Sequence, residues 1–182
     1  MQIGYKLAAE AFGPAELIRQ ASKAEEAGFD FVEISDHFHP WLDNQGHSPF
    51  AWTVLGAIAA KTDRIGLAIG VTYPTVRYHP AIIAQAAATL ALVSDGRFTL
   101  GIGAGERLNE HVVGRGFPDA RVRHEMLREA VAYVEVAEQF VDVGFDHLVM
   151  QNAGPDPDGF IDFFQRELEP AIRQLVPQGA AA

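Results

Sequence analysis

Short apolar segments alternate along the chain with longer segments whose apolar residues recur at helical spacing. An apolar run bounded by turn residues indicates a strand, and a repeat near 3.6 residues indicates a helix. The predicted strands are Ile3–Leu7, Phe31–Ser35, Ile65–Val71, Phe98–Ile102 and His147–Met150. The predicted helices run from Pro14 to a cap at Gly28, over Phe50–Lys61, over Pro80–Val93, from an N-cap at Asp119 to Gly144, and over Gly159–Leu175. This alternation predicts an α/β fold with five parallel strands.

One junction between helix and strand occurs twice. Glu26–Asp30 precedes the second predicted strand, and Asp142–Asp146 precedes the fifth; each contains Gly-Phe-Asp ahead of an apolar run. Such a repeated junction is typical of a parallel sheet covered by helices. Two architectures are compatible with it, an open doubly wound sheet and a (β/α) barrel with units missing, because a complete eight-unit barrel takes about 250 residues.

Composition narrows the class of protein and of partner. The 182 residues suit a single domain spanning residues 1–182. The formal net charge of −10 argues against a nucleic-acid partner, which would need clustered Lys and Arg. There is no cysteine, so disulfides, thiolate catalysis and cysteine metal ligands are excluded. The longest apolar stretch, Ala81–Val93, is too short to span a membrane, and Met1–Leu7 lacks a signal-peptide pattern. We expect a soluble, cytoplasmic protein that acts on a small molecule.

The segment after the second predicted strand contains the first cluster of chemically active residues. Asp36, His37 and Trp41 place an acid, an imidazole and an indole within six residues, which suits proton transfer beside a flat apolar surface. An Asp–His pair that only fixes a loop is the alternative, and His39 is expected to be structural or exposed. A zinc hydrolase using His37 and His39 is a further alternative, but zinc needs three protein ligands and no other cluster accompanies them. We therefore expect no metal.

Glycine-rich segments follow the third and fourth predicted strands. Gly70 lets the backbone approach a ligand, although a simple turn with an aromatic staple explains that loop equally well. Gly103–Gly105 has the spacing G-x-G-x-G, which is not the dinucleotide-binding fingerprint but clears space beside a large planar ligand. Glu106 is a candidate acid or base there. Arg107 and Glu110 are expected to form a solvated ion pair.

Seven segments together identify a family. They are Ser35–Trp41, Gln45–Phe50, Thr75–Pro80, Gly103–Glu106, Asn109–Glu110, Gly144–Asp146 and Gly154–Asp156. In combination they resemble the F420-dependent glucose-6-phosphate dehydrogenase-like group of the bacterial luciferase-like family, over Ile3 to about Val131 and about Tyr133 to Leu175. The resemblance implies an incomplete (β/α) TIM-type barrel that binds the deazaflavin coenzyme F420, or FMN as the alternative, at the carboxyl ends of its strands.

The resemblance also implies roles for individual residues. Asp36 would hydrogen-bond the deazaflavin, His37 and Glu106 would handle protons, and Trp41 would pack near the reacting carbon. A cis peptide at Gly70–Val71 would support the back of the ring. Further cofactor contacts are implied at Ala104, Gly105 and Asn109, and at Tyr73, where the dehydrogenase has Thr.

The chain departs from the family between about Ala130 and Glu135. Residues 1–131 resemble the N-terminal part of the family barrel, and residues 132–182 resemble its C-terminal helix, strand and helix. The skipped part would contain barrel strands five to seven, the site for the F420 tail and, in the dehydrogenase, the basic residues that bind the sugar phosphate. Glucose-6-phosphate specificity therefore does not carry over.

Two functional hypotheses follow. The first is an F420-dependent oxidoreductase, possessing full or reduced activity, that transfers a hydride between a small organic substrate and the deazaflavin. The alternative is a non-catalytic truncated barrel that binds ligand weakly or self-associates. A partial barrel has exposed sheet edges, which proteins seldom leave bare, so we expect a homo-oligomer and favour a dimer.

Overall fold

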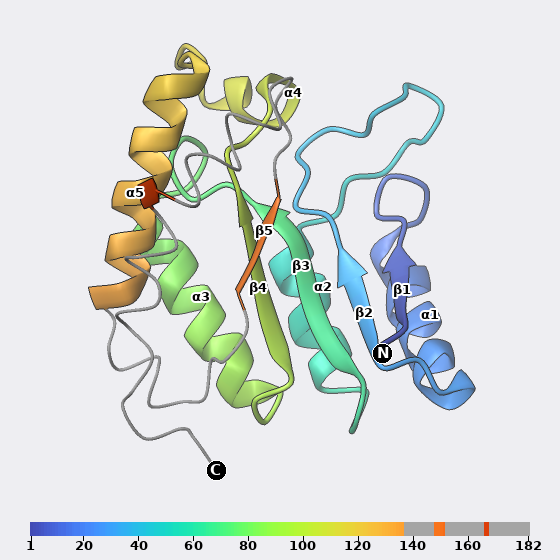
Figure 1. Ribbon diagram of the computed structural model, residues 1–182. Helices are drawn as coiled ribbons and strands as arrows, with labels where there is room; N and C mark the ends of the chain where they lie inside the picture. The colour runs from blue at the N-terminus through green and yellow to red at the C-terminus, as the bar shows by residue number, and fades with distance from the viewer. Residues whose placement is uncertain (137–147, 152–165, 168–182) are drawn as a thin grey trace.

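The computed structural model describes residues 1–136, 148–151 and 166–167, and in it five parallel strands form one sheet in chain order (Figure 1). The strands are β1 Gly4–Leu7, β2 Phe31–Ile34, β3 Gly66–Thr72, β4 Phe98–Gly103 and β5 Leu148–Gln151. Each overlaps a strand that the apolar pattern predicts. The predicted sheet of five parallel strands is therefore confirmed.

Helices connect the strands, and their ends follow local sequence signals. They are α1 Pro14–Ala27, α2 Ala51–Ala59, α3 Pro80–Val93, α4 Arg107–Glu110, the 3₁₀ helix η1 His111–Val113, and α5 Ala120–Val136. Gly28 ends α1 with φ 86°, a left-handed conformation that glycine adopts without a steric cost. Asp119 caps α5 as predicted, because its Oδ1 accepts a hydrogen bond of 3.0 Å from Val122 N. Predictions at Asp142–Asp146 and Gly154–Asp156 lie outside the described residues, as does Gly159–Leu175 except for residues 166–167.

The winding of the chain decides between the two architectures. Along the chain, α1 packs on α2, α2 on α3, and α3 on α5, so these helices form one layer. A doubly wound sheet reverses its strand order and has helices on both faces, whereas a (β/α) barrel keeps chain order and has helices only outside. The fold is therefore an incomplete (β/α) barrel, and the strand order places β1 and β5 at the two ends of the described sheet. In the described ranges, no helix has the length and apolar character needed to cross a membrane.

The core lies between the sheet and the helix layer. It contains large side chains with no more than 2% exposure, each of which contributes roughly 1.5–3 kcal/mol when fully buried. Among them are Leu7, Leu17, Ile34, Leu55, Ile58, Leu67, Ile69 and Ile102. Side chains that alternate with these along the strands point to the other, inner face. There Lys6 Nζ lies 2.7 Å from Glu33 Oε1 and donates to Gly70 O at 3.1 Å.

A bulge interrupts the pairing of β3 with β4. The register shifts between Ile69 and Thr72, and the Gly70–Val71 peptide bond in this segment is cis, as the family resemblance implied. A Cβ atom on Gly101 of β4 would overlap the carbonyl oxygen of Ile69, so the two backbones approach here more closely than a side chain permits. The bulge leaves Gly70 and Val71 partly exposed next to the candidate site.

Candidate active site

Three titratable side chains meet at the carboxyl ends of the strands. Glu10 follows β1, His37 follows β2 and Glu106 follows β4. His37 Nδ1 lies 2.5 Å from Glu10 Oε1, and His37 Nε2 lies 3.5 Å from Glu106 Oε1. All three side chains are largely buried. The structure therefore brings the two predicted proton-handling residues together and places a carboxylate on each nitrogen of the imidazole.

Sequence reasoning missed Glu10, which is 7% exposed. Its contact with His37 is the main cause that lowers the pKa of Glu10 below its ordinary value, and burial acts against that shift. The two atoms are within hydrogen-bonding distance, although the N–H direction is not well aligned. A carboxylate beside Nδ1 favours the proton on that nitrogen, and in that tautomer the Nε2 lone pair would face Glu106. The one sequence signal for Glu10 was its place as an acidic residue directly after the first strand, at the edge of the sheet where all parallel strands end.

Trp41 completes the group around the imidazole. Its indole ring meets the His37 ring edge to face, with ring centroids 5.0 Å apart. The side chain is 55% exposed, so one side of the indole is free to contact a ligand. An amphipathic aromatic surface of this kind suits a planar or small apolar molecule.

Asn109 ties the loop after β2 to α4. Its Oδ1 accepts hydrogen bonds from Phe38 N at 2.6 Å and His39 N at 2.8 Å, and its Nδ2 donates to Glu106 Oε1. Asn109 is 2% exposed. Its amide therefore holds His37 and Glu106 in a fixed relation, and a direct contact between Asn109 and a cofactor stays a prediction.

Asp36 is buried in a network of protein hydrogen bonds. Its Oδ2 accepts from Thr72 Oγ1 at 2.5 Å, and its Oδ1 accepts from Tyr78 OH at 2.9 Å. Arg77 Nη2 lies 3.1 Å from Oδ1. The carboxylate thus joins β2 to the loop after β3, and a hydrogen bond from Asp36 to a cofactor stays a prediction.

The expected solvated pair of Arg107 and Glu110 is wrong. Glu110 is 2% exposed, and it contacts Arg77, whose backbone N–H donates to Glu110 Oε2 at 3.0 Å. Burial raises the pKa of Glu110 to about 7, while Arg77 acts to lower it. The physical reason is the short α4, which turns back toward the sheet after β4 and carries Glu110 into the protein interior.

The remaining predicted cofactor contacts differ in accessibility. Gly70, Val71 and Gly105 are partly exposed, whereas Ala104 is 3% and Tyr73 is 2% exposed. Gly105 has φ 69°, and a Cβ atom there would overlap the Tyr73 ring. Tyr73 therefore packs under the glycine-rich loop. The Ala104 carbonyl accepts a hydrogen bond from Arg123 Nη1 at 3.0 Å, and a contact of Ala104 with a cofactor stays a prediction.

His39 stacks on His111 with ring centroids 6.0 Å apart. Within residues 1–136, 148–151 and 166–167, no three His, Asp or Glu side chains converge in the manner of metal ligands. The zinc-hydrolase alternative therefore gains no support from the described part of the chain.

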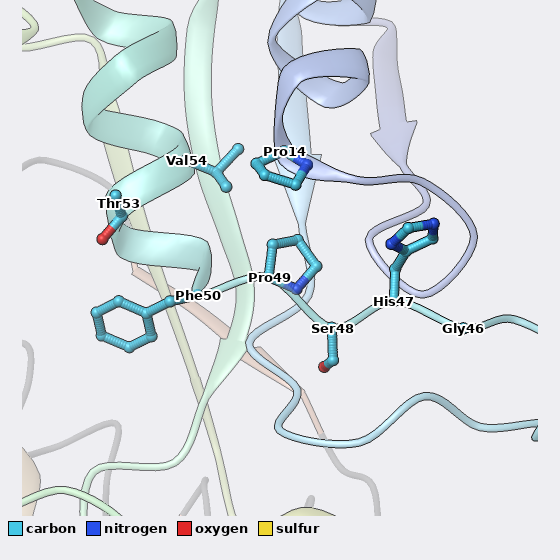
Figure 2. A pocket seen from close by; sticks show the side chains of 8 residues that line it. All are labelled: Pro14, Gly46, His47, Ser48, Pro49, Phe50, Thr53 and Val54. Carbon is cyan, nitrogen blue, oxygen red and sulfur yellow. The ribbon is translucent and has the colours of Figure 1, made fainter.

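A groove of about 480 Å³ lies beside this site rather than in it. Its lining residues are Pro14, Gly46, His47, Ser48, Pro49, Phe50, Thr53 and Val54 (Figure 2). It is connected to the site through two hydrogen bonds, from Ser48 Oγ to His37 O at 2.8 Å and from His47 N to Glu10 O at 3.1 Å. The groove is open, and none of His37, Trp41 and Glu106 lines it. The cluster around His37, rather than this groove, is therefore the candidate site.

The sequence also matches the model of a known protein family. The model of the luciferase-like monooxygenase family matches residues 1–153, which is most of the chain. The chain belongs to the luciferase-like monooxygenase family. The family resemblance inferred from the motifs is thereby confirmed.

Within this family, the chain is similar to F420-dependent glucose-6-phosphate dehydrogenases. It is 51% identical to the one from Kineococcus radiotolerans and 47% identical to the one from Beutenbergia cavernae, in each case over 135 residues. These matches cover 74% of this chain but 40% of each relative. The matched part thus spans well under half the length of the curated relatives.

A solved structure of the luciferase-like fold resembles the chain closely. An F420-dependent secondary alcohol dehydrogenase, in complex with an F420–acetone adduct, matches with a TM-score of 0.74 and 39% identity. The match covers 76% of this chain and 42% of that protein. The likeness supports the incomplete-barrel description, because the chain corresponds to part of a larger fold.

Proposed function

We propose that the chain is an F420-dependent oxidoreductase of the luciferase-like family, acting on a small organic substrate. The observation that carries this proposal is the His37 imidazole, which has Glu10 at one nitrogen and Glu106 3.5 Å from the other. F420-dependent dehydrogenases that are 39–51% identical to this chain support the choice of cofactor. FMN is the alternative cofactor.

The residues around His37 fit a flat ring. The bulge in β3 leaves backbone at Gly70 and Val71 partly exposed, and the Glu33 carboxylate lies where a Cβ atom of Gly70 would be. Gly105 is partly exposed and packs against the Tyr73 ring, and Trp41 provides an exposed indole. We infer that these residues would hold the deazaflavin ring, with Asp36 and Asn109 keeping the loops in place. When bound, F420 would supply the atom that exchanges a hydride, and the protein would supply orientation and electrostatics.

The proton-handling step follows from the imidazole's surroundings. Loss of a hydride from an alcohol carbon makes its hydroxyl proton acidic, so a nearby base must accept that proton. His37 Nε2 is such a base, because Glu10 favours the proton on Nδ1 and stabilises the positive ring that forms when Nε2 accepts one. Glu106, 3.5 Å away, can exchange that proton with His37. Trp41 would limit access of water on the exposed side.

Binding of F420 tests the proposal directly. We expect the full chain, titrated into F420, to quench the fluorescence of the cofactor. The expected dissociation constant is in the micromolar range, which corresponds to a binding free energy of about −8 kcal/mol. FMN titrated in parallel measures the alternative cofactor. No binding of F420 at tens of micromolar protein would defeat the proposal.

A truncated barrel that self-associates is the second candidate, and the outer face of the helix layer favours it. Three apolar side chains of α3 are exposed: Ile82 at 55%, Leu92 at 67% and Val93 at 55%. The helix contains no charged residue, and a groove of about 350 Å³ runs between it and α2. An uncharged face is where two copies of a chain with net charge −10 repel each other least. We propose a homodimer through this face.

Light scattering after gel filtration tests the dimer. The double substitution Leu92→Lys and Val93→Lys is expected to shift the chain from dimer to monomer, because it places charges in an apolar contact. Gln2→Lys, at an exposed position outside α3, is the control and should leave the dimer intact. A dimer that survives the α3 substitutions would indicate pairing through the sheet ends β1 and β5 instead, and a monomeric wild-type chain would refute pairing altogether.

A further inference from the structure

A second buried cluster lies next to the His37 site and takes no part in the proposed proton transfer. It consists of Arg77 between two carboxylates, Asp36 and Glu110. The three side chains are 8%, 1% and 3% exposed, respectively. A buried guanidinium with buried partners on both sides is a fixed element rather than a surface ion pair.

Arg77 connects three segments that are distant in sequence. Its Nη2 donates to Asp36 O at 2.6 Å and lies 3.1 Å from Asp36 Oδ1, at the end of β2. Its backbone N–H donates to Glu110 Oε2 at 3.0 Å, and its Nε lies 3.8 Å from Glu110 Oε1, on α4. Its guanidinium also lies over the Tyr78 ring, 4.6 Å from the centroid.

Both ion-pair partners of Arg77 adjoin a residue of the proton-handling pair. Asp36 directly precedes His37 in the chain. Glu110 lies one turn after Glu106, and its backbone N–H donates to Glu106 O at 3.2 Å. Because Arg77 contacts both Asp36 and Glu110, a shift of its guanidinium changes the distance between the segments that carry His37 and Glu106.

We propose that Arg77, held between Asp36 and Glu110, is a positioning residue that sets the separation of His37 and Glu106. The planar fork of arginine is needed, because it contacts a backbone carbonyl and a carboxylate on one side while its Nε faces another carboxylate. Lysine has one compact ammonium group and cannot make these contacts together. The predicted effect on kcat rests on the proposed function, whereas the predicted effect on the His37–Glu106 separation does not.

The test compares two Arg→Lys substitutions in the full chain. Arg77→Lys is expected to lengthen the His37–Glu106 separation in a crystal structure by about 1 Å, and misplacement of that size can lower kcat by up to about 100-fold. Arg97→Lys is the matched control, because Arg97 also binds several backbone carbonyls but precedes β4, at the opposite end of the sheet. It should lower stability without changing kcat, KM or the separation.

The outcomes separate the inference from the proposed function. An unchanged separation in Arg77→Lys, or equal losses of kcat in both variants, would overturn the positioning role. A longer separation in a chain whose wild type has no F420-dependent turnover would uphold the positioning role and refute the oxidoreductase.

If Arg77→Lys fails to fold, Glu110→Gln is the second variant that tests the positioning role. It retains an acceptor for Arg77 N–H but removes the ion pair. The ionisable groups that face Glu110 are Asp36, Glu106, Arg77, Tyr73 and Tyr78. Since the pKa of Glu110 is about 7, wild-type kcat should fall as the pH drops below 7 and the pair with Arg77 is lost. Glu110→Gln should have a low kcat above pH 7, where Glu110 of the wild type is ionised, and a longer His37–Glu106 separation in a crystal structure; a wild-type separation would contradict the inference.

Discussion

Glu106→Gln is expected to lower kcat for F420-dependent turnover by about 10²- to 10⁴-fold, the usual contribution of a positioned acid or base. Glutamine retains the size of the side chain and an oxygen for the hydrogen bond from Asn109, so the loop should keep its conformation. It cannot exchange a proton with His37 Nε2, from which Glu106 Oε1 is 3.5 Å away. Steady-state kinetics with propan-2-ol and glucose 6-phosphate as probe substrates measure the effect.

Binding distinguishes this loss from unfolding. Affinity for F420, measured by fluorescence quenching, should be unchanged in Glu106→Gln, because the carboxylate would act on the transition state and not on the bound cofactor. Glu129→Gln, an exposed position on α5, removes the same charge outside the site and should keep the wild-type kcat. Full turnover in Glu106→Gln would eliminate the proposed proton-handling pair.

Gly101→Ala is expected to lower the free energy of unfolding by about 2–3 kcal/mol, at the upper end for an overpacked interior. The added Cβ would overlap the carbonyl oxygen of Ile69 and lie 3.4 Å from Val71 Cγ1. Both atoms belong to the bulged strand β3, and a backbone carbonyl in a sheet cannot move aside as a flexible side chain does. Denaturant unfolding followed by circular dichroism measures the change.

Gly56→Ala is the matched control for this substitution. Gly56 lies within α2, and a Cβ atom there has no heavy atom within 4 Å. Alanine should therefore stabilise the chain by about 0.5–1 kcal/mol, through its better helix propensity. If Gly101→Ala proved as stable as Gly56→Ala, β3 and β4 would not be packed as closely as described.

The element order was predictable from the chain alone, and the reason is local. Alternation of apolar runs with helical periods reflects which face of each segment is buried, so it located all five strands. Gly28 and Asp119 marked a helix end and a helix start, because capping depends on backbone conformation within a few residues. The choice between an open doubly wound sheet and a barrel stayed open, since strand order is not a local property.

The site was predictable in part. His37 and Glu106 belong to short motifs at strand ends, and they meet as expected. Glu10 belongs to no motif, and its importance appears only because β1 and β2 pair in parallel and end beside each other. Glu110 was misread, because its spacing from Arg107 suits a surface pair while its burial depends on how α4 turns back toward the sheet.

The sequence alone therefore determined the α/β class, the five strands and the loops that contain the candidate site residues. It did so through the periodicity of its apolar residues, its capping residues and the positions of its glycines. The tertiary structure decided which charged groups share a buried environment. Arg77 contacts Asp36 across 41 positions of sequence and Glu110 across 33. Contacts between such distant segments depend on the strand order and on the bulge in β3, and burial then gives the ionic contacts their strength by removing water.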